Sequence, residues 1–234
     1  MAATLRVAAY NLRGMRDDRA AAARVVRAIA PDVLCLQEVP RHFLFGHRVA
    51  DFAVACGLYW TGGSRGSGGT TIMTSLRVET LATSHERLAV RSLDQQRGFA
   101  WQVLRRPGGP TVGVASLHLS LRAAERRTHV ADVLARLPQD LPLVVAGDVN
   151  EPPTGRAWKA LAARLPVVSA DAFTFPSSRP RARIDGIFAD PALTVVAGEG
   201  AADRSAVVLD EGDLRAATDH RPIWVDLDLG ALTP

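Results

Sequence analysis

The sequence predicts an α/β (α+β) protein in which two mixed β-sheets pack face to face and helices cover the outer faces. Three observations lead to this prediction. A strand, a helix and a second strand follow one another near the N-terminus, which is typical of a crossover between parallel neighbours. Later strand patterns are separated by short turns, as in antiparallel hairpins. Helical periodicity occurs in only three or four segments, too few to alternate with every strand.

The N-terminal half contains most of the predicted strands. We expect strands over 4–10 and 33–36, with a helix over 17–30 that Pro31 ends between them. A second helix is predicted over 43–58. After a glycine-rich loop at 62–69, strand patterns resume over 70–74, 76–83, 98–105 and 111–117. Pro107-Gly108-Gly109-Pro110 is typical of a hairpin connection between the last two.

The C-terminal half is built around the run from Leu143 to Asn150, whose unbroken apolar residues indicate a strand buried on both faces. A helix over 121–137 precedes it and a short helix over 154–161 follows it. Further strands are predicted over 181–188, 193–197, 206–209 and 222–229.

Length and composition are consistent with one domain over residues 1–234, because no segment resembles a linker and no internal repeat is evident. A hydrophobic content of 47% with 22% charged residues is ordinary for a globular chain. No apolar run approaches the roughly 20 residues of a membrane-spanning helix, and the N-terminus lacks the apolar core of a secretory signal. We therefore expect a cytoplasmic monomer with no integral membrane segment.

The formal charge is +4 and the pI about 9.8. Of the 28 lysine and arginine residues, all but Lys159 are arginines. Because arginine forks onto phosphate oxygens, this composition is compatible with a phosphate-bearing partner. A general bias towards arginine in an alanine-rich sequence explains it equally well, so the net charge supports a phosphate ligand without establishing one.

Several common sites are excluded. The 62–69 loop has glycines but no G-K-[ST] ending of a phosphate-binding loop. Neither H-E-x-x-H nor a pair of Cys-x-x-Cys motifs is present to hold zinc. Two cysteines cannot form a disulfide framework, and Cys35 in a strand and Cys56 in a helix are expected to be buried thiols.

Polar residues recur where the predicted buried strands end or begin. These residues are Asn11, Glu38, His118, Asp148, Asn150, Asp185, Asp219 and His220. Each has an ordinary structural explanation when taken singly: a turn residue, a solvated strand end, a core histidine or, for Asp185 beside Arg183, a surface ion pair. Taken together, they indicate one polar cleft at the edge of a sandwich.

The residue types in this predicted cleft suit metal binding and proton transfer. Acid and amide oxygens suit a hard cation such as Mg²⁺ or Mn²⁺ better than zinc. Histidine and carboxylate together can supply proton transfers near neutral pH. Phosphoester hydrolysis needs an activated water, neutralisation of charge on the phosphate oxygens, and help for the leaving group.

Six short motifs follow one another along the chain: Asn11, Leu36-Gln37-Glu38-Val39, Ser116-Leu117-His118-Leu119, Gly147-Asp148-Val149-Asn150, Arg183-Ile184-Asp185 and Thr218-Asp219-His220-Arg221-Pro222. In this order they resemble the endonuclease/exonuclease/phosphatase superfamily, which has the pancreatic deoxyribonuclease fold. Each motif is weak alone, but together they follow the family order from residue 5 to 229. The resemblance implies a four-layer sandwich and a phosphoester hydrolase that requires Mg²⁺ or Mn²⁺.

The resemblance also implies roles for the acids and amides. Glu38 would bind the metal, with Asn11 beside it and Asp219 completing the metal or proton network. Asp148 would orient or deprotonate the attacking water, and Asn150 would hold the scissile phosphate.

The histidines and two arginines complete the predicted site. His220, positioned by Asp185, would contact or protonate the phosphate, and His118 would assist the leaving group, as in the deoxyribonuclease and sphingomyelinase branches. Arg97 lies near a family arginine, and Arg183 would share a strand face with Asp185, so both are predicted to contact substrate. A solvated arginine is an equal alternative for Arg183. Gly186 departs from the family pattern, which often has an aromatic residue there.

We therefore expect a phosphodiesterase or nuclease acting on a phosphoester, with nucleic acid as the leading substrate class. One alternative is a phosphatase or phosphodiesterase for a small or lipid-linked phosphate, such as an inositol phosphate or sphingomyelin. A remote alternative is a scaffold that kept the fold and lost the chemistry.

Overall fold

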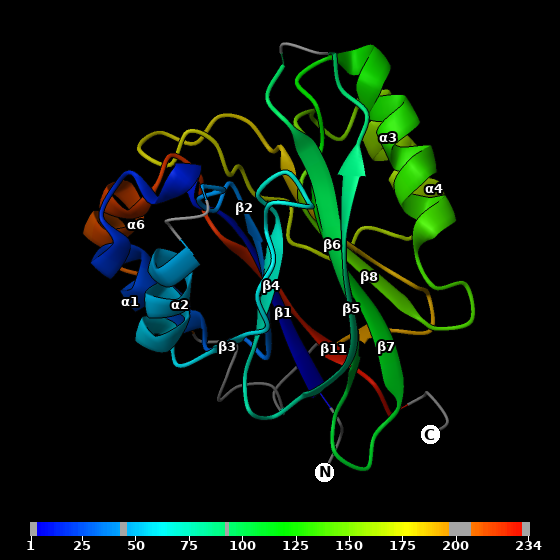
Figure 1. Cartoon of the computed structure of the whole chain (residues 1–234), viewed down its shortest axis with the longest axis horizontal. Helices are drawn as coiled ribbons and strands as arrows, with labels where there is room; N and C mark the ends of the chain where they lie inside the picture. The colour runs from blue at the N-terminus through cyan, green and yellow to red at the C-terminus, as the bar shows by residue number, and fades with distance from the viewer. Residues whose placement is uncertain (1–3, 43–45, 92–93, 197–206, 231–234) are drawn as a thin grey trace.

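Two mixed β-sheets pack face to face with helices on their outer faces, which confirms the predicted fold class (Figure 1). This computed structural model describes residues 4–42, 46–91, 94–196 and 207–230. The first sheet has the order β10-β11-β1-β2-β4-β3, with β1 Thr4–Asn11, β2 Val33–Gln37, β3 Tyr59–Trp60, β4 Thr71–Thr74, β10 Thr194–Val195 and β11 Ile223–Asp228. The second has the order β5-β6-β7-β8-β9, with β5 Glu79–Leu88, β6 Arg97–Arg105, β7 Thr111–His118, β8 Leu143–Asp148 and β9 Asp185–Ala189.

Each sheet has its own helical layer. The helices α1 (Arg19–Ile29), α2 (Gly46–Cys56) and α6 (Glu211–Ala217) cover the first sheet, and α3 (Ala123–Arg136) and α4 (Arg156–Arg164) cover the second. In Figure 1 the two groups lie on opposite sides of the paired sheets.

The alternation of side chains along each strand explains the continuous apolar runs. In β1, Val7 and Ala9 pack between the sheets, whereas Ala8 and Tyr10 pack under the helices. Strand β8 behaves in the same way: its even-numbered apolar residues face the other sheet and its odd-numbered ones face α3 and α4. Each central strand is therefore buried on both faces, and only its ends can present polar groups to solvent.

Local signals position the first crossover. The Asp18 carboxylate accepts hydrogen bonds from the backbone N–H groups of Ala20 and Ala21, which caps α1. Ala30 takes a left-handed conformation (φ 51°) that ends the helix, and β2 then runs parallel to β1. The predicted hairpin at 107–110 joins the antiparallel β6 and β7, and Cys35 and Cys56 are buried free thiols, as expected.

The last third differs most from the prediction. We expected a strand over 206–209. Ala206 lies outside the described residues, residues 207–209 form no strand, and the helix α6 follows them. The sequence gives little helical periodicity here because α6 has only seven residues. It is nevertheless capped by Asp210, whose carboxylate accepts from Asp213 N, and it buries Leu214 and Ala217.

Several boundaries also shift. Strand β9 begins at Asp185 and not at residue 181, because the preceding residues turn towards Phe175, which bridges Ala182. Strand β5 begins at Glu79 after a turn, and the short edge strand β3 was not predicted. Residues 43–45 of the second predicted helix and Ala197 of the 193–197 strand lie outside the described residues. No helix in the described part of the chain has the length and apolar character to cross a membrane.

Candidate active site

Strand pairing brings most of the predicted polar residues to one edge of the sandwich. Asn11 is the last residue of β1, and Glu38 follows the end of its parallel neighbour β2. In the second sheet, parallel β7 and β8 end side by side at His118 and Asp148. Because β9 runs antiparallel to β8, it begins where β8 ends, and Asp185 stands opposite Asp148. Four strand ends and one strand start thus meet at one place.

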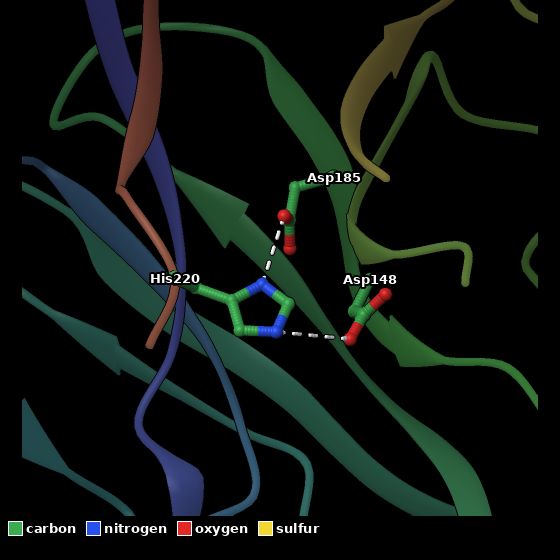
Figure 2. A group of neighbouring side chains, drawn as sticks. All are labelled: Asp148, Asp185 and His220. Carbon is green, nitrogen blue, oxygen red and sulfur yellow. Dashed lines mark hydrogen bonds and ion pairs between the residues drawn. The ribbon is translucent and has the colours of Figure 1, made fainter. Parts of the chain in front are cut away.

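His220 reaches this edge from the segment that precedes β11. Its Nδ1 lies 2.9 Å from Oδ2 of Asp185 and its Nε2 lies 3.8 Å from Oδ2 of Asp148 (Figure 2). All three side chains are buried, and their ligand atoms lie within 4.8 Å of one another. The alternative explanation of Asp185, a surface ion pair with Arg183, does not hold: the carboxylate is bonded to His220, and Arg183 pairs with Asp171.

Burial and neighbouring charge shift the pKa values of this group. Burial raises the pKa of Asp148, and the nearby Asp185 charge raises it further, against the lowering effect of His220. Burial alone would lower the pKa of His220, but the charge and hydrogen bond of Asp185 outweigh it and raise that pKa well above 6.5. At neutral pH, His220 is therefore an imidazolium that donates from Nδ1 to Asp185 and presents Nε2–H towards Asp148.

The pKa of His118 is shifted in the opposite direction to that of His220. It is 1% exposed, and burial, followed by the positive charges of Arg97, His220 and Arg41, holds its pKa well below 6.5. Its Nε2 lies 3.4 Å from Asp148 Oδ2 and 3.9 Å from Glu38 Oε1. Because the ring is neutral, these two contacts are not ion pairs.

Asn11 links the two halves of the site. Its Nδ2 donates to Oδ2 of Asp148 at 3.0 Å and to Oε1 of Glu38 at 3.3 Å. Its Oδ1 accepts from the backbone N–H of Arg13 at 3.0 Å. Asn11 therefore holds the two carboxylates in place through its nitrogen, and the second lone pair of its oxygen is left for a further ligand.

Glu38 is the most accessible carboxylate of the group. Its side chain is 28% exposed and it lines a cavity of about 500 Å³. A hydrated divalent ion fits such a place, because Mg²⁺ binds through one or two carboxylates and keeps several waters. The Asp148–Asp185–His220 group also brings three possible ligand atoms within 4.8 Å of one another, but all three side chains are buried, which leaves less room for a hydrated ion.

Asn150 is held in the loop after β8. It has a positive φ of 56°, which asparagine tolerates better than most residues. Its backbone N–H donates to Oδ1 of Asp148 at 2.9 Å, and its Nδ2 donates to the carbonyl of Leu119. Gly147 allows the approach to β7 just before it, because a Cβ there would collide with the carbonyl oxygen of Leu117.

Asp219 lies at the rim and not within the buried group. Its Oδ2 is 3.5 Å from Nε of Arg13, and its side chain is 31% exposed. The neighbouring Thr218 donates from Oγ1 to the carbonyl of Asn11 at 3.0 Å. This hydroxyl ties the segment before β11 to the end of β1.

The two arginines predicted to contact substrate have different surroundings. Arg97 is 4% exposed, and its Nη1 has no hydrogen-bond partner among the described residues. Burial lowers its pKa, and the charges of Glu38 and Asp148 oppose that shift. Arg183 is turned away: its Nη1 pairs with Asp171 at 2.8 Å and its guanidinium lies 5.2 Å from the Trp158 ring centre.

Two residues at the site were not singled out from the sequence. The ring of Phe175 lies 5.0 Å from the ring of His220 and forms a wall beside it. Glu151, which is buried, accepts from Arg126 Nε at 2.9 Å and from Trp158 N at 2.8 Å, so it anchors the loop that carries Asn150. Only the position of Glu151, directly after Asn150, could have drawn attention to it.

Comparison with known proteins agrees with this architecture. A profile described as the endonuclease/exonuclease/phosphatase family matches residues 8–220. An endonuclease/exonuclease/phosphatase from Bacteroides vulgatus has a TM-score of 0.74 at 18% identity, covering 97% of this chain and 99% of that one. The human Nocturnin catalytic domain, with bound sulfate, has a TM-score of 0.72 at 22% identity and coverages of 97% and 95%. A mannosyl-6-phosphatase from Bacteroides thetaiotaomicron has a TM-score of 0.72 at 21% identity and coverages of 95% and 99%. No curated protein matches the chain.

Proposed function

The chain belongs to the endonuclease/exonuclease/phosphatase family, and on that premise we propose that it is a divalent-metal-dependent phosphodiesterase that cleaves P–O bonds by attack of water. Members of the superfamily are phosphoester hydrolases. The observation that carries the proposal is the buried group in which His220 is bonded to Asp185 at 2.9 Å and faces Asp148 at 3.8 Å. We expect nucleic acid as the substrate class, which the basic composition supports.

We assign the metal, Mg²⁺ or Mn²⁺, to the Glu38 carboxylate, which is the accessible acid beside the buried group. Asn11 supports this carboxylate through its Nδ2, and Asp219 at the rim remains a predicted member of the same network. A bound divalent ion would neutralise charge that develops on the phosphate oxygens.

The remaining steps use the side chains of the chain itself. Asp148 accepts a proton from the attacking water, for which its raised pKa is suited. The His220 imidazolium donates a hydrogen bond to a phosphate oxygen, while Asp185 fixes its orientation. Asn150 holds the phosphate as a neutral donor. His118, neutral and beside both carboxylates, assists the leaving group.

A substrate panel tests this proposal. Plasmid DNA, single-stranded DNA, RNA, bis-p-nitrophenyl phosphate and inositol phosphates are incubated with Mg²⁺, with Mn²⁺ and with EDTA. We expect turnover of a phosphodiester with metal and none with EDTA. His220→Ala should reduce that turnover by about 10²-fold or more, as expected for removal of a group that acts in the transition state. Hydrolysis of monoesters alone would instead favour the phosphatase alternative, and no turnover of any substrate would contradict the proposal.

A further inference from the structure

A second cavity with strongly positive walls lies beside the candidate active site. Its volume is about 420 Å³, within the range of roughly 300–1,000 Å³ that is typical of small-molecule sites. Three arginines line it: Arg41, Arg65 and Arg87. They come from the segment after β2, from the 62–69 loop and from β5. Three separate parts of the chain therefore direct cationic side chains to one place, which we call the arginine cavity.

The positive charge of the arginine cavity is not compensated within the described residues. Arg41, Arg65 and Arg87 form no salt bridge there. Asp94 is the carboxylate among the lining residues, and it is paired with Arg122, whose Nε lies 2.5 Å from its Oδ2. Other surface arginines do have an acidic partner, among them Arg24, Arg105 and Arg136.

The arginine cavity is continuous with the active site. It shares Arg41, His42 and Gln95 with the cavity of about 500 Å³ that Glu38 lines. The positive charge of Arg41 also helps to lower the pKa of the buried His118 in the active site. A phosphate that reacts beside Glu38 would thus have the arginine cavity as its immediate neighbour.

Arg97 gives an independent indication of an anion in this region. Its guanidinium is almost completely buried, yet Nη1 has no hydrogen-bond partner among the described residues. It lines a small hollow that shares Asp94 and Gln95 with the arginine cavity. A buried donor of this kind costs free energy unless it is satisfied, and a ligand oxygen would satisfy it.

We propose that the arginine cavity binds a second phosphate group of the substrate, next to the phosphate that is cleaved. The substrate then carries at least two phosphates, either along a nucleotide chain or on one small molecule. The inference rests on the proposed function for its choice of reacting phosphate, but binding of the second phosphate can be measured without turnover. Guanidinium groups suit this task because each can donate two parallel hydrogen bonds to phosphate oxygens.

Calorimetric titration in EDTA at about 0.15 M salt tests the proposal, since weak surface attraction is screened there. The probes are thymidine 3′,5′-bisphosphate against thymidine 5′-monophosphate, and inositol 1,4-bisphosphate against inositol 1-phosphate. We expect at least one bisphosphate to bind about tenfold or more tightly than its monophosphate, as expected for hydrogen bonds to charged groups. The double variant Arg65→Ala/Arg87→Ala should abolish that difference. Both side chains are exposed, so the fold should tolerate their removal.

The matched control is Arg127→Ala/Arg156→Ala, which removes two exposed arginines of α3 and α4 that form no salt bridge among the described residues and line neither cavity. It should leave the preference for the bisphosphate unchanged. A preference for the thymidine probe assigns the second phosphate to a nucleotide chain, and a preference for the inositol probe assigns it to a small molecule. Equal binding of mono- and bisphosphates by the wild type, or equal losses in the two double variants, would overturn the proposal. Neither outcome depends on whether the protein hydrolyses phosphodiesters.

Discussion

Buried charged side chains lie at both ends of strand β1, but their charge is compensated differently at the two ends. At the end away from the candidate site, Arg6 is 2% exposed and donates to both carboxylate oxygens of Asp226, at 2.8 and 2.6 Å. Its Nη1 donates to the carbonyl of Ile29. Nearby, the buried Asp32 accepts from the backbone N–H of Arg6 and from the side chain of Arg77. Each buried charge here has an opposite charge as its partner.

At the other end, negative charge is in excess. The carboxylates of Asp148 and Asp185 lie beside His220, and that of Glu38 lies 3.9 Å from His118. The charges of Glu38 and Asp148 also raise the pKa of the nearby Arg97, against the effect of its burial. The raised pKa of Asp148 reflects the cost of this arrangement. We infer from this contrast that the Arg6 end stabilises the fold, and the Glu38 end is consistent with the proposed binding of a cation and a phosphate.

The largest expected effect comes from Asp148→Asn. Turnover of a phosphodiester should fall by about 10²- to 10⁴-fold, because the variant cannot accept a proton. The metal-free free energy of unfolding should stay the same or rise, since a buried carboxylate next to Asp185 is removed. Steady-state kinetics and urea unfolding in EDTA measure the two quantities. A stable variant that retains full activity would remove Asp148 from the reaction, and a large loss of stability would break the contrast between the two ends.

Arg6→Met is expected to lower the stability of the protein and to leave its turnover unchanged. Removal of the cation leaves Asp226 without its partner, and the free energy of unfolding should fall by about 3–5 kcal/mol. The kcat of the folded protein should not change, because Arg6 lies at the far end of β1. Urea unfolding followed by kinetics at low temperature measures both.

The matched control for that pair is Arg6→Met/Asp226→Asn. It should regain part of the lost stability, because the unpaired carboxylate is gone. Equal stability of Arg6→Met and wild type would mean that the ion pair has no role in holding this end together.

A smaller stability effect should follow metal binding. Mg²⁺ at about 100 times its Kd should raise the wild-type free energy of unfolding by about 2.7 kcal/mol, because it binds only the folded state. Glu38→Gln should lose this increase, whereas Asp226→Asn, at the other end of the sheet, should keep it. Thermal unfolding with and without Mg²⁺ gives the comparison. An unchanged increase in Glu38→Gln would place the ion elsewhere.

The sequence predicts the Glu38 end well and the Arg6 end not at all, for a physical reason. Asn11, Glu38 and Asp148 each follow a continuous apolar run, so their place at a strand end can be deduced from periodicity alone. Arg6 lies within the apolar run of β1, but the run does not identify its partner: Asp226 lies 220 residues away, and only the antiparallel register of β1 and β11 brings the two together.

The same limit applies within the site. Periodicity and spacing alone could not choose the partner of Asp185, because Arg183 is the nearer candidate along the chain; the family resemblance implied His220, which is the partner in space. The arginine cavity could not be predicted from the sequence either, because its three arginines come from segments whose relative positions depend on packing. Periodicity determines where a strand ends, whereas pairing across the sandwich depends on tertiary structure.

The smallest effect compares two histidines. His220 has a raised pKa because Asp185 compensates its burial. His85 has the hydroxyl of Ser67 as its side-chain partner at 3.1 Å, and burial lowers its pKa below 6.5 despite a hydrogen bond with the backbone of Gly62. A lowered pKa means that the unfolded chain binds protons more readily, so the contribution of His85 to stability is present above about pH 6.5 and is lost as the pH falls below it.

His85→Gln should therefore reduce the loss of stability between about pH 7 and about pH 5, where histidine titrates, while leaving the stability at higher pH nearly unchanged. Urea unfolding of both proteins at several pH values measures the slope. Identical slopes for wild type and His85→Gln would show that burial without an opposite charge does not shift this ring. The difference between His85 and His220 would then need a cause other than the presence of a carboxylate.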